Sequence, residues 1–244
     1  MHDTGLEIAR FGEGRRAVVV LHEGLGSVST WRGWPERLHA RCGAPVVAYS
    51  RAGYGRSPPV PLPRPLDYMQ REARDLPRVL DAMGVDEAVL VGHSDGASIA
   101  IVCAATSPRV LGLALIAPHV FVEDVTVASI AAARREYEHG SLRERLARHH
   151  ANVDVAFRGW CDAWLDPAFG EWNITEHLPN VRVPVLVVQG DADPYGTLAQ
   201  VDAIREGVRG PFEAIILAGA AHAPWREREE ETTTAVCTLV RRVL

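Results

Sequence analysis

Lysine is missing from this sequence of 244 residues, and all 26 of its basic residues are arginine. Chemistry that needs a lysine amine, such as a Schiff base, is therefore excluded, and with it pyridoxal enzymes and lysine-type aldolases. The chain also lacks a long charged run of one sign, and its formal net charge is -5. We therefore expect neither a nucleic acid nor an anionic membrane as its partner.

Two further absences concern the environment of the protein. The opening residues lack the basic and then apolar pattern of a secretory signal. No stretch approaches the roughly 18 apolar residues of a membrane span. The cysteines lie far apart and form no CxxC pair, so we expect four reduced, packing thiols in a cytoplasmic protein. These cysteines are Cys42, Cys103, Cys161 and Cys237.

Short apolar runs alternate with helical segments along most of the chain. Most of these runs are almost entirely apolar, which is typical of strands buried on both faces of a parallel sheet. They span residues 17–21, 45–49, 88–91, 111–116, 185–189 and 213–217, with 6–11 as an additional edge strand. The sequence therefore predicts an α/β fold with a mostly parallel central sheet flanked by helices.

One segment interrupts this rhythm. Residues 121–171 carry charge, histidines and tryptophans and read as helical, although they lie between two predicted strands. About 50 residues is far longer than a usual crossover. We therefore expect a helical cap at 121–171 over a core made of residues 1–120 and 172–244.

The first chemical motif follows the strand at 88–91. Residues 92–96 read G-H-S-D-G and lead into an apolar helix, which is the strand-turn-helix context of a G-x-S-x-G nucleophile turn. Glycines permit the tight turn, which exposes Ser94 at a helix N-terminus. We expect the backbone amide of Asp95 to face a developing oxyanion.

An acid and a base follow the next two predicted strands. Asp193 comes after the strand at 185–189, and His222 comes after the strand at 213–217. The order Ser, Asp, His is the order that this type of fold uses. Asp191 competes for the acid role, but it is better explained as a turn residue that binds local amides. We therefore predict Ser94, Asp193 and His222 as the catalytic residues.

A glycine-rich loop, residues 22–27 with the sequence H-E-G-L-G-S, follows the strand at 17–21. It can bring a second backbone amide, that of Gly24, to the oxyanion. The same letters resemble half of a dinucleotide fingerprint, but Ser50 and Arg51 stand where an acid would bind the ribose. We therefore expect an oxyanion hole here and no cofactor.

Together these pieces resemble the α/β-hydrolase superfamily over essentially the whole chain. Residues 53–57, G-Y-G-R-S, look like that family's loop after the second core strand, although Ser50 and Ala52 replace its usual Asp and Arg. His22-Glu23 stands where His-Gly is usual. Within the superfamily, the Ser-Asp-Gly elbow is similar to that of valacyclovir hydrolase-like enzymes, which cleave esters of α-amino acids.

This resemblance implies that Asp95 holds the amino group of the substrate. A carboxylate beside the nucleophile is also a physically suitable partner for an ammonium group, and Glu23 adds a second. The alternative is that Asp95 only favours its own helix N-terminus. Two more substrate-binding candidates are His119, a cap or substrate contact, and Trp164, for which packing inside the cap is the alternative.

The predicted activity is hydrolysis of a small carboxylic ester, with a small molecule as partner and without a metal. The adjacent pair His149-His150 would point about 100° apart on a helix, which does not favour zinc binding. Two alternatives remain open: the same residues acting on a thioester, a lactone or a carbon-carbon bond, and a non-catalytic receptor of the same fold. The sequence gives neither the physiological substrate nor the oligomeric state.

Overall fold

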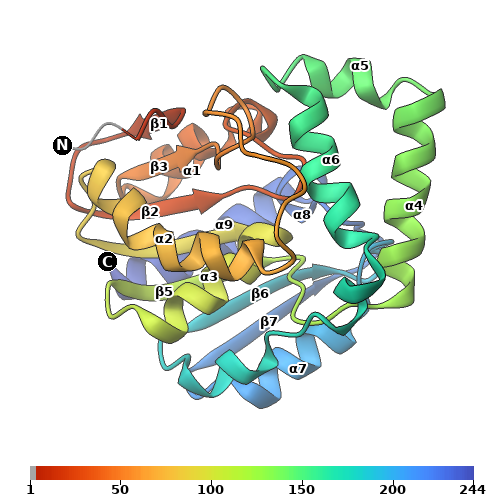
Figure 1. Cartoon of the computed structure of the whole chain (residues 1–244). Helices are drawn as coiled ribbons and strands as arrows, with labels where there is room; N and C mark the ends of the chain where they lie inside the picture. The colour runs from red at the N-terminus through yellow and green to blue at the C-terminus, as the bar shows by residue number, and fades with distance from the viewer. Residues whose placement is uncertain (1–3) are drawn as a thin grey trace.

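A seven-stranded sheet forms the centre of the molecule (Figure 1). The computed structural model describes residues 4–244. The strand order is β1-β3-β2-β4-β5-β6-β7; β1 is antiparallel to its neighbour and every other pair is parallel. The strands are β1 (Ile8–Phe11), β2 (Arg16–Leu21), β3 (Val46–Tyr49), β4 (Glu87–His93), β5 (Val110–Ile116), β6 (Val185–Gly190) and β7 (Phe212–Leu217). The predicted fold class is confirmed.

Apolar side chains on both faces of the sheet create two cores, as the continuous apolar runs predict. In β2, Val19 and Leu21 belong to one core and Val18 and Val20 belong to the other. The first core is covered by α2 (Tyr68–Ala82), α3 (Asp95–Thr106) and α7 (Ala199–Gly207). The second is covered by α1 (Trp34–Cys42), α8 (Pro224–Glu227) and α9 (Glu229–Val243).

Between β5 and β6 the chain leaves the sheet and forms three helices, α4 (Asp124–His139), α5 (Leu142–Ala147) and α6 (Val153–Trp164). They stand together at the right of Figure 1, and we refer to them as the cap helices. A bridge between Phe121 and Asn173 joins the two ends of this segment. Short 3-10 turns complete the chain: η1 (Ser29–Trp31), η2 (Pro167–Glu171) and η3 (Thr175–Asn180). Among the described residues, no helix has the length and hydropathy needed to cross a bilayer.

The expectation of four reduced thiols is wrong for two cysteines. Cys42, at the end of α1, and Cys237, in α9, form a disulfide with their Cα atoms 4.9 Å apart. They are 195 positions apart in the sequence, and only the packing of α1 beside α9 on one face of the sheet brings them together. Cys103 and Cys161 are free and buried, as expected.

Thiol titration of protein prepared without reductant tests this pairing. In denaturant, we expect two reactive thiols per chain, because Cys42 and Cys237 are joined. After reduction all four should react, and the Cys42→Ser variant should show three without reduction, since its former partner is released. Four reactive thiols in the untreated wild-type chain would contradict the disulfide.

Candidate active site

Ser94 occupies a sharp turn between β4 and α3. Its backbone has φ 54° and ψ -121°, a conformation that costs a non-glycine residue about 1–3 kcal/mol. The flanking glycines allow the turn to fit: a Cβ on Gly92 would lie 2.4 Å from the carbonyl oxygen of Gly96, and one on Gly96 would lie 2.3 Å from that of Leu21. The strain is therefore sustained by packing on all sides and places Ser94 at the head of the sheet.

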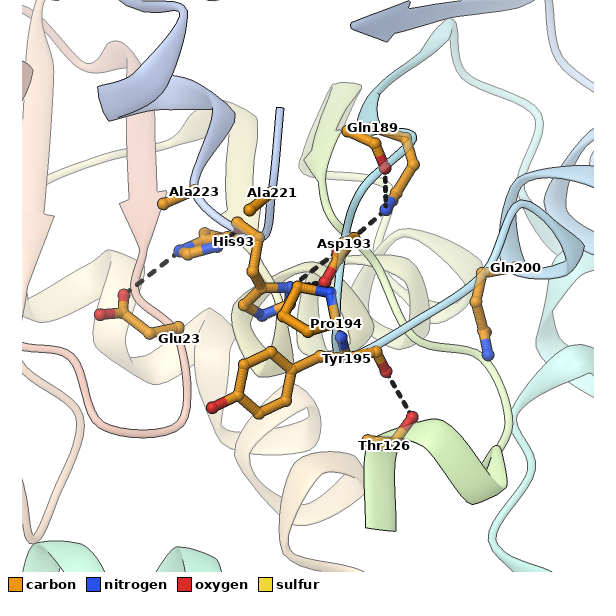
Figure 2. Close-up of polar contacts among 12 residues, drawn as sticks. Glu23, His93, Thr126, Gln189, Asp193, Pro194, Tyr195, Gln200, Ala221 and Ala223 are labelled. Carbon is orange, nitrogen blue, oxygen red and sulfur yellow. Dashed lines mark hydrogen bonds and ion pairs between the residues drawn. The ribbon is translucent and has the colours of Figure 1, made fainter. Parts of the chain in front are cut away.

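His222 lies in the loop after β7, and Asp193 holds its ring. The Nδ1 atom of His222 is 2.9 Å and 2.8 Å from the two carboxylate oxygens of Asp193. The side-chain amide of Gln189 and the backbone amide of Tyr195 also donate to this carboxylate, at 2.9 Å and 2.8 Å (Figure 2). Although burial raises the pKa of Asp193, the His222 hydrogen bond and charge outweigh it and leave the pKa below its usual value.

Asp191, the competing acid, has a different contact. Its carboxylate accepts a hydrogen bond from the backbone amide of Gly219 at 2.6 Å and so ties together the loops after β6 and β7. The structure thus places Asp193 at the histidine and Asp191 in the turn. Since Asp193 occupies Nδ1, the Nε2 atom of His222 is left for another partner.

Ser94 and His222 line one small cavity of about 100 Å³, which we call the inner pocket. Loops from the sheet form its floor, and α4 and α6 of the cap form its roof. The lining residues are Glu23, Gly24, Leu25, Ser94, Asp95, His119, Thr126, Ile130, Trp160, Trp164, Tyr195 and His222. Six predicted site residues therefore meet there, in addition to Gly24, which closes the pocket from the loop after β2. The remaining predicted residue, Asp193, lies behind His222.

Two backbone amides are available beside Ser94. The Asp95 amide opens α3, and the Gly24 amide belongs to the loop after β2; neither donates to another group within residues 4–244. A Cβ on Gly24 would lie 2.2 Å from the ring of Trp160 in α6. The cap therefore packs directly on the glycine loop, and this position requires a residue without a side chain.

The carboxylate of Asp95 is buried but only half satisfied. The Tyr68 hydroxyl donates to its Oδ2 at 2.5 Å, and Trp164 donates to that hydroxyl at 3.0 Å. The other oxygen, Oδ1, is buried and has no hydrogen-bond partner among the described residues. An unpaired buried carboxylate oxygen is costly, and it is a ready acceptor for a donor that enters the pocket.

A buried cluster of charges lies behind Asp95. Glu72 accepts from Arg51 at 3.0 Å and from Arg64 at 2.9 Å, and both guanidinium groups stack on Tyr54, at 4.6 Å and 4.7 Å from its ring centre. One carboxylate cannot balance two cations, and Asp95 supplies the second negative charge. Burial raises the pKa of Asp95 above its usual value, and the charge of Arg51 and the hydrogen bond from Tyr68 offset this rise only in part.

Glu23 lines the inner pocket and faces His93 (Figure 2). Its Oε2 is 3.3 Å from Nδ1 of His93, and Nε2 of His93 donates to the backbone carbonyl of His222 at 2.6 Å. Although burial raises the pKa of Glu23, hydrogen bonding and charge at His93 lower it to about 2. The departure from the usual His-Gly thus adds a fixed anion next to the elbow.

Two further histidines join the cap to the core. His119 lies in the inner pocket against Trp164, and burial lowers its pKa to about 3, so it stays neutral. His150 accepts from the amide of Gly55 and contacts the Leu25 carbonyl, both at 3.0 Å, which joins the cap to two core loops. In the described part of the chain, no three His, Cys, Asp or Glu side chains are grouped as metal ligands.

Sequence reasoning missed the residues that support Asp95. Tyr68 reads as one more apolar position of a helix, and Arg51, Arg64 and Glu72 read as ordinary surface charges. All four approach Asp95 from segments 23 to 44 positions away, and no local pattern marks that meeting. Arg51 alone follows a predicted strand closely, since it lies two positions after the end of β3.

Comparisons with known proteins agree with this fold. The profile of the alpha/beta hydrolase family matches residues 18–235. The human protein serine hydrolase BPHL is 30% identical over 212 residues, which cover 84% of this chain and 72% of that protein. The resemblance to alpha/beta hydrolases of the valacyclovir hydrolase type is thereby confirmed.

Two solved structures show the likeness of the fold. Proline iminopeptidase of Mycobacterium smegmatis has a TM-score of 0.77 at 18% identity, covering 96% of this chain and 94% of its own. The enol-lactonase of Burkholderia xenovorans has a TM-score of 0.72 at 19% identity, covering 97% and 96%. At such identities the comparison concerns the fold and leaves the substrate open.

A substitution at Gly24 tests the contact between the glycine loop and the cap. We expect Gly24→Ala to lower the free energy of unfolding by about 1–3 kcal/mol, because the new methyl group overlaps the ring of Trp160. Gly170→Ala is the matched control: a Cβ there meets nothing within 4 Å, so stability should change by less than about 0.5 kcal/mol. Equal denaturation midpoints for the two variants would show that the cap does not rest on Gly24.

Proposed function

This chain belongs to the alpha/beta hydrolase family, and on that premise we propose that it is a serine hydrolase that cleaves small carboxylic esters through an acyl-enzyme. The observation that carries the proposal is the shared inner pocket, in which strained Ser94 and the Asp193-bound His222 meet. Three loops from distant parts of the chain supply a hydroxyl, an imidazole and a carboxylate at one place. That combination is the one that acyl transfer requires.

In the first step, His222 acts through its Nε2 atom, because Asp193 occupies Nδ1. Nε2 takes the proton of Ser94 as the hydroxyl oxygen attacks the ester carbonyl. The amides of Gly24 and Asp95 stabilise the oxyanion, and the positive end of α3 adds to this effect. His222 then gives the proton to the leaving oxygen, and an acyl-serine remains.

In the second step, water takes the place of the leaving group. His222 removes a proton from the water, the resulting hydroxide attacks the acyl carbon, and the proton returns to Ser94. Asp193 stays ionised throughout because His222 lowers its pKa, so it stabilises the imidazolium in both steps. His119 has a pKa of about 3, so it is too weak a base to replace His222.

The acyl group that suits the inner pocket is a small α-aminoacyl group. Asp95 Oδ1 supplies an unpaired acceptor for an ammonium group, and Glu23 adds negative charge at the pocket edge. His119 and Trp164 complete the substrate contacts that we propose. The volume of about 100 Å³ is smaller than the roughly 150 Å³ of a cavity that holds benzene, which favours an alanyl-sized group.

Covalent labelling and turnover test the hydrolase mechanism. We expect a fluorophosphonate to label wild-type Ser94, and we expect Ser94→Ala to lose both labelling and at least about a thousandfold in kcat/KM on an alanyl ester. Asp193→Asn should also lose activity, because the ring of His222 is no longer held for proton transfer. A wild-type chain that resists labelling and hydrolyses no ester would favour a non-catalytic receptor of this fold.

A pair of matched substrates tests the ammonium site. Wild-type kcat/KM should be higher for an alanyl ester than for its N-acetyl form, and Asp95→Asn should reduce this ratio by about 30-fold or more, since a buried charge pair is lost. The backbone amide that faces the oxyanion is kept in this variant. Because both esters are measured on one preparation, misfolding cancels in the ratio. Equal rates on both esters in the wild type would remove this role from Asp95.

A further inference from the structure

A second and larger cavity adjoins the inner pocket. It has a volume of about 450 Å³ and shares Glu23, Leu25 and His222 with the inner pocket; we call it the outer cleft. Its other walls come from the loop after β2, from α5 of the cap and from α8. The imidazole that serves Ser94 therefore stands at the junction of two cavities.

The two cavities differ in their charged side chains, because only the outer cleft is lined by arginines. The inner pocket has carboxylates and no arginine, whereas the outer cleft includes Arg32, Arg145 and Arg226. Arg145 already faces Glu136 at 3.6 Å, but the guanidinium groups of Arg32 and Arg226 have no ion-pair or hydrogen-bond partner among residues 4–244. The carboxylates that line the outer cleft, those of Glu23 and Glu227, form hydrogen bonds with other groups.

Glu227, for example, accepts from the backbone amides of Ala221 and Ala223, at 2.6 Å and 3.2 Å. Glu23 faces His93. Neither Arg32 nor Arg226 therefore forms an ion pair with a carboxylate of the described chain, although Glu227 also lines the outer cleft.

Arg32 also has an uncommon backbone conformation. Its φ is 49° and its ψ is 41°, in the left-handed region that favours glycine or asparagine. Gly33, next in the chain, is also left-handed. An arginine in this conformation has a conformational cost, and outliers of this kind concentrate at functional positions. In the chain this residue ends the turn η1, where the backbone amide of Arg32 donates to the carbonyl of Ser29.

We propose that the outer cleft binds the leaving group of the substrate and that Arg32 and Arg226 select a leaving group that carries a carboxylate or a phosphate. This inference rests on the proposed hydrolase function and specifies its substrate class. Guanidinium groups suit both anions because their donors match pairs of oxygens. The substrate would then be cationic at its acyl end and anionic at its leaving end.

The direction of the substrate follows from the chemistry. When the tetrahedral intermediate collapses, the bond between the acyl carbon and the leaving oxygen breaks, and that oxygen takes the proton from Nε2 of His222. The leaving group must therefore lie beside His222 and must depart before water attacks. The open outer cleft allows that departure, whereas the inner pocket, beneath α4 and α6, keeps the acyl group.

Alanyl benzyl esters that differ only in a para substituent test the proposal. We expect kcat/KM to be highest for the carboxylate and phosphonomethyl esters, lower for the unsubstituted ester, and lowest for an aminomethyl ester. The anionic-to-neutral ratio should be about tenfold, since two exposed cations contribute modestly, and it should fall as salt is added. A carboxylate preference without a phosphonate preference, or the reverse, would identify which anion the cleft fits.

Variants then assign the preference to the two arginines. The anionic-to-neutral ratio should approach one in the Arg32→Gln/Arg226→Gln double variant, and Arg32→Glu/Arg226→Glu should prefer the aminomethyl ester. Arg78→Gln is the matched control: it removes one unpaired, exposed arginine from α2 and should keep the wild-type ratio. A structural role for Arg32 would lower turnover of all the esters together and leave the ratio unchanged.

The outcomes separate this inference from the function on which it rests. If wild-type protein hydrolyses the alanyl esters at equal kcat/KM whatever the para charge, the anion site is refuted and the hydrolase stands. If no ester is cleaved and Ser94 is not labelled, the proposed function fails and the leaving-group site fails with it. A ratio that persists in the double variant would show that other groups select the anion.

Discussion

The close approach of the first turn of α3 to β2 and β4 is the constraint on which the site depends. At Gly96 the helix comes so near the carbonyl of Leu21 that no side chain fits, and Gly92 is confined in the same way. This packing holds Ser94 in its strained conformation and aims the opening amide of the helix at the same space. A looser elbow would relax the serine and move it away from His222, because the strain persists only while the neighbours enforce it.

The second organising feature is electrostatic. Two buried arginines, Arg51 and Arg64, share the single carboxylate of Glu72, and Asp95 completes the charge balance. A buried ionic group is stable only when its charges are paired and its polar atoms are satisfied. The Oδ1 atom of Asp95 departs from that rule, because it has no hydrogen-bond partner among the described residues. Asp95 lines the inner pocket. The ammonium group of a bound substrate, as we propose it, would supply the hydrogen bond that Oδ1 of Asp95 lacks in the free protein.

The two cavities beside His222 also differ in the charged side chains that line them. Carboxylates lie on the side where we place the acyl group, and unpaired arginines lie on the side where we place the leaving group. His222 stands between them, fixed through its ring by Asp193 and through its backbone carbonyl by His93. The cap encloses the acyl side, because Trp160 packs on the glycine loop, and the other side stays open. One imidazole thereby serves two cavities of different size and charge.

The sequence by itself determined the sheet, its mostly parallel order and the three loops that carry Ser94, Asp193 and His222, because each is encoded locally by an apolar run followed by a short motif. Tertiary structure alone decided what is made by contacts between distant segments. The disulfide from Cys42 to Cys237, the charge cluster behind Asp95 and the two cavities beside His222 belong to this class. Their members occupy unremarkable positions in helices and loops, and only the folded chain brings them within bonding distance.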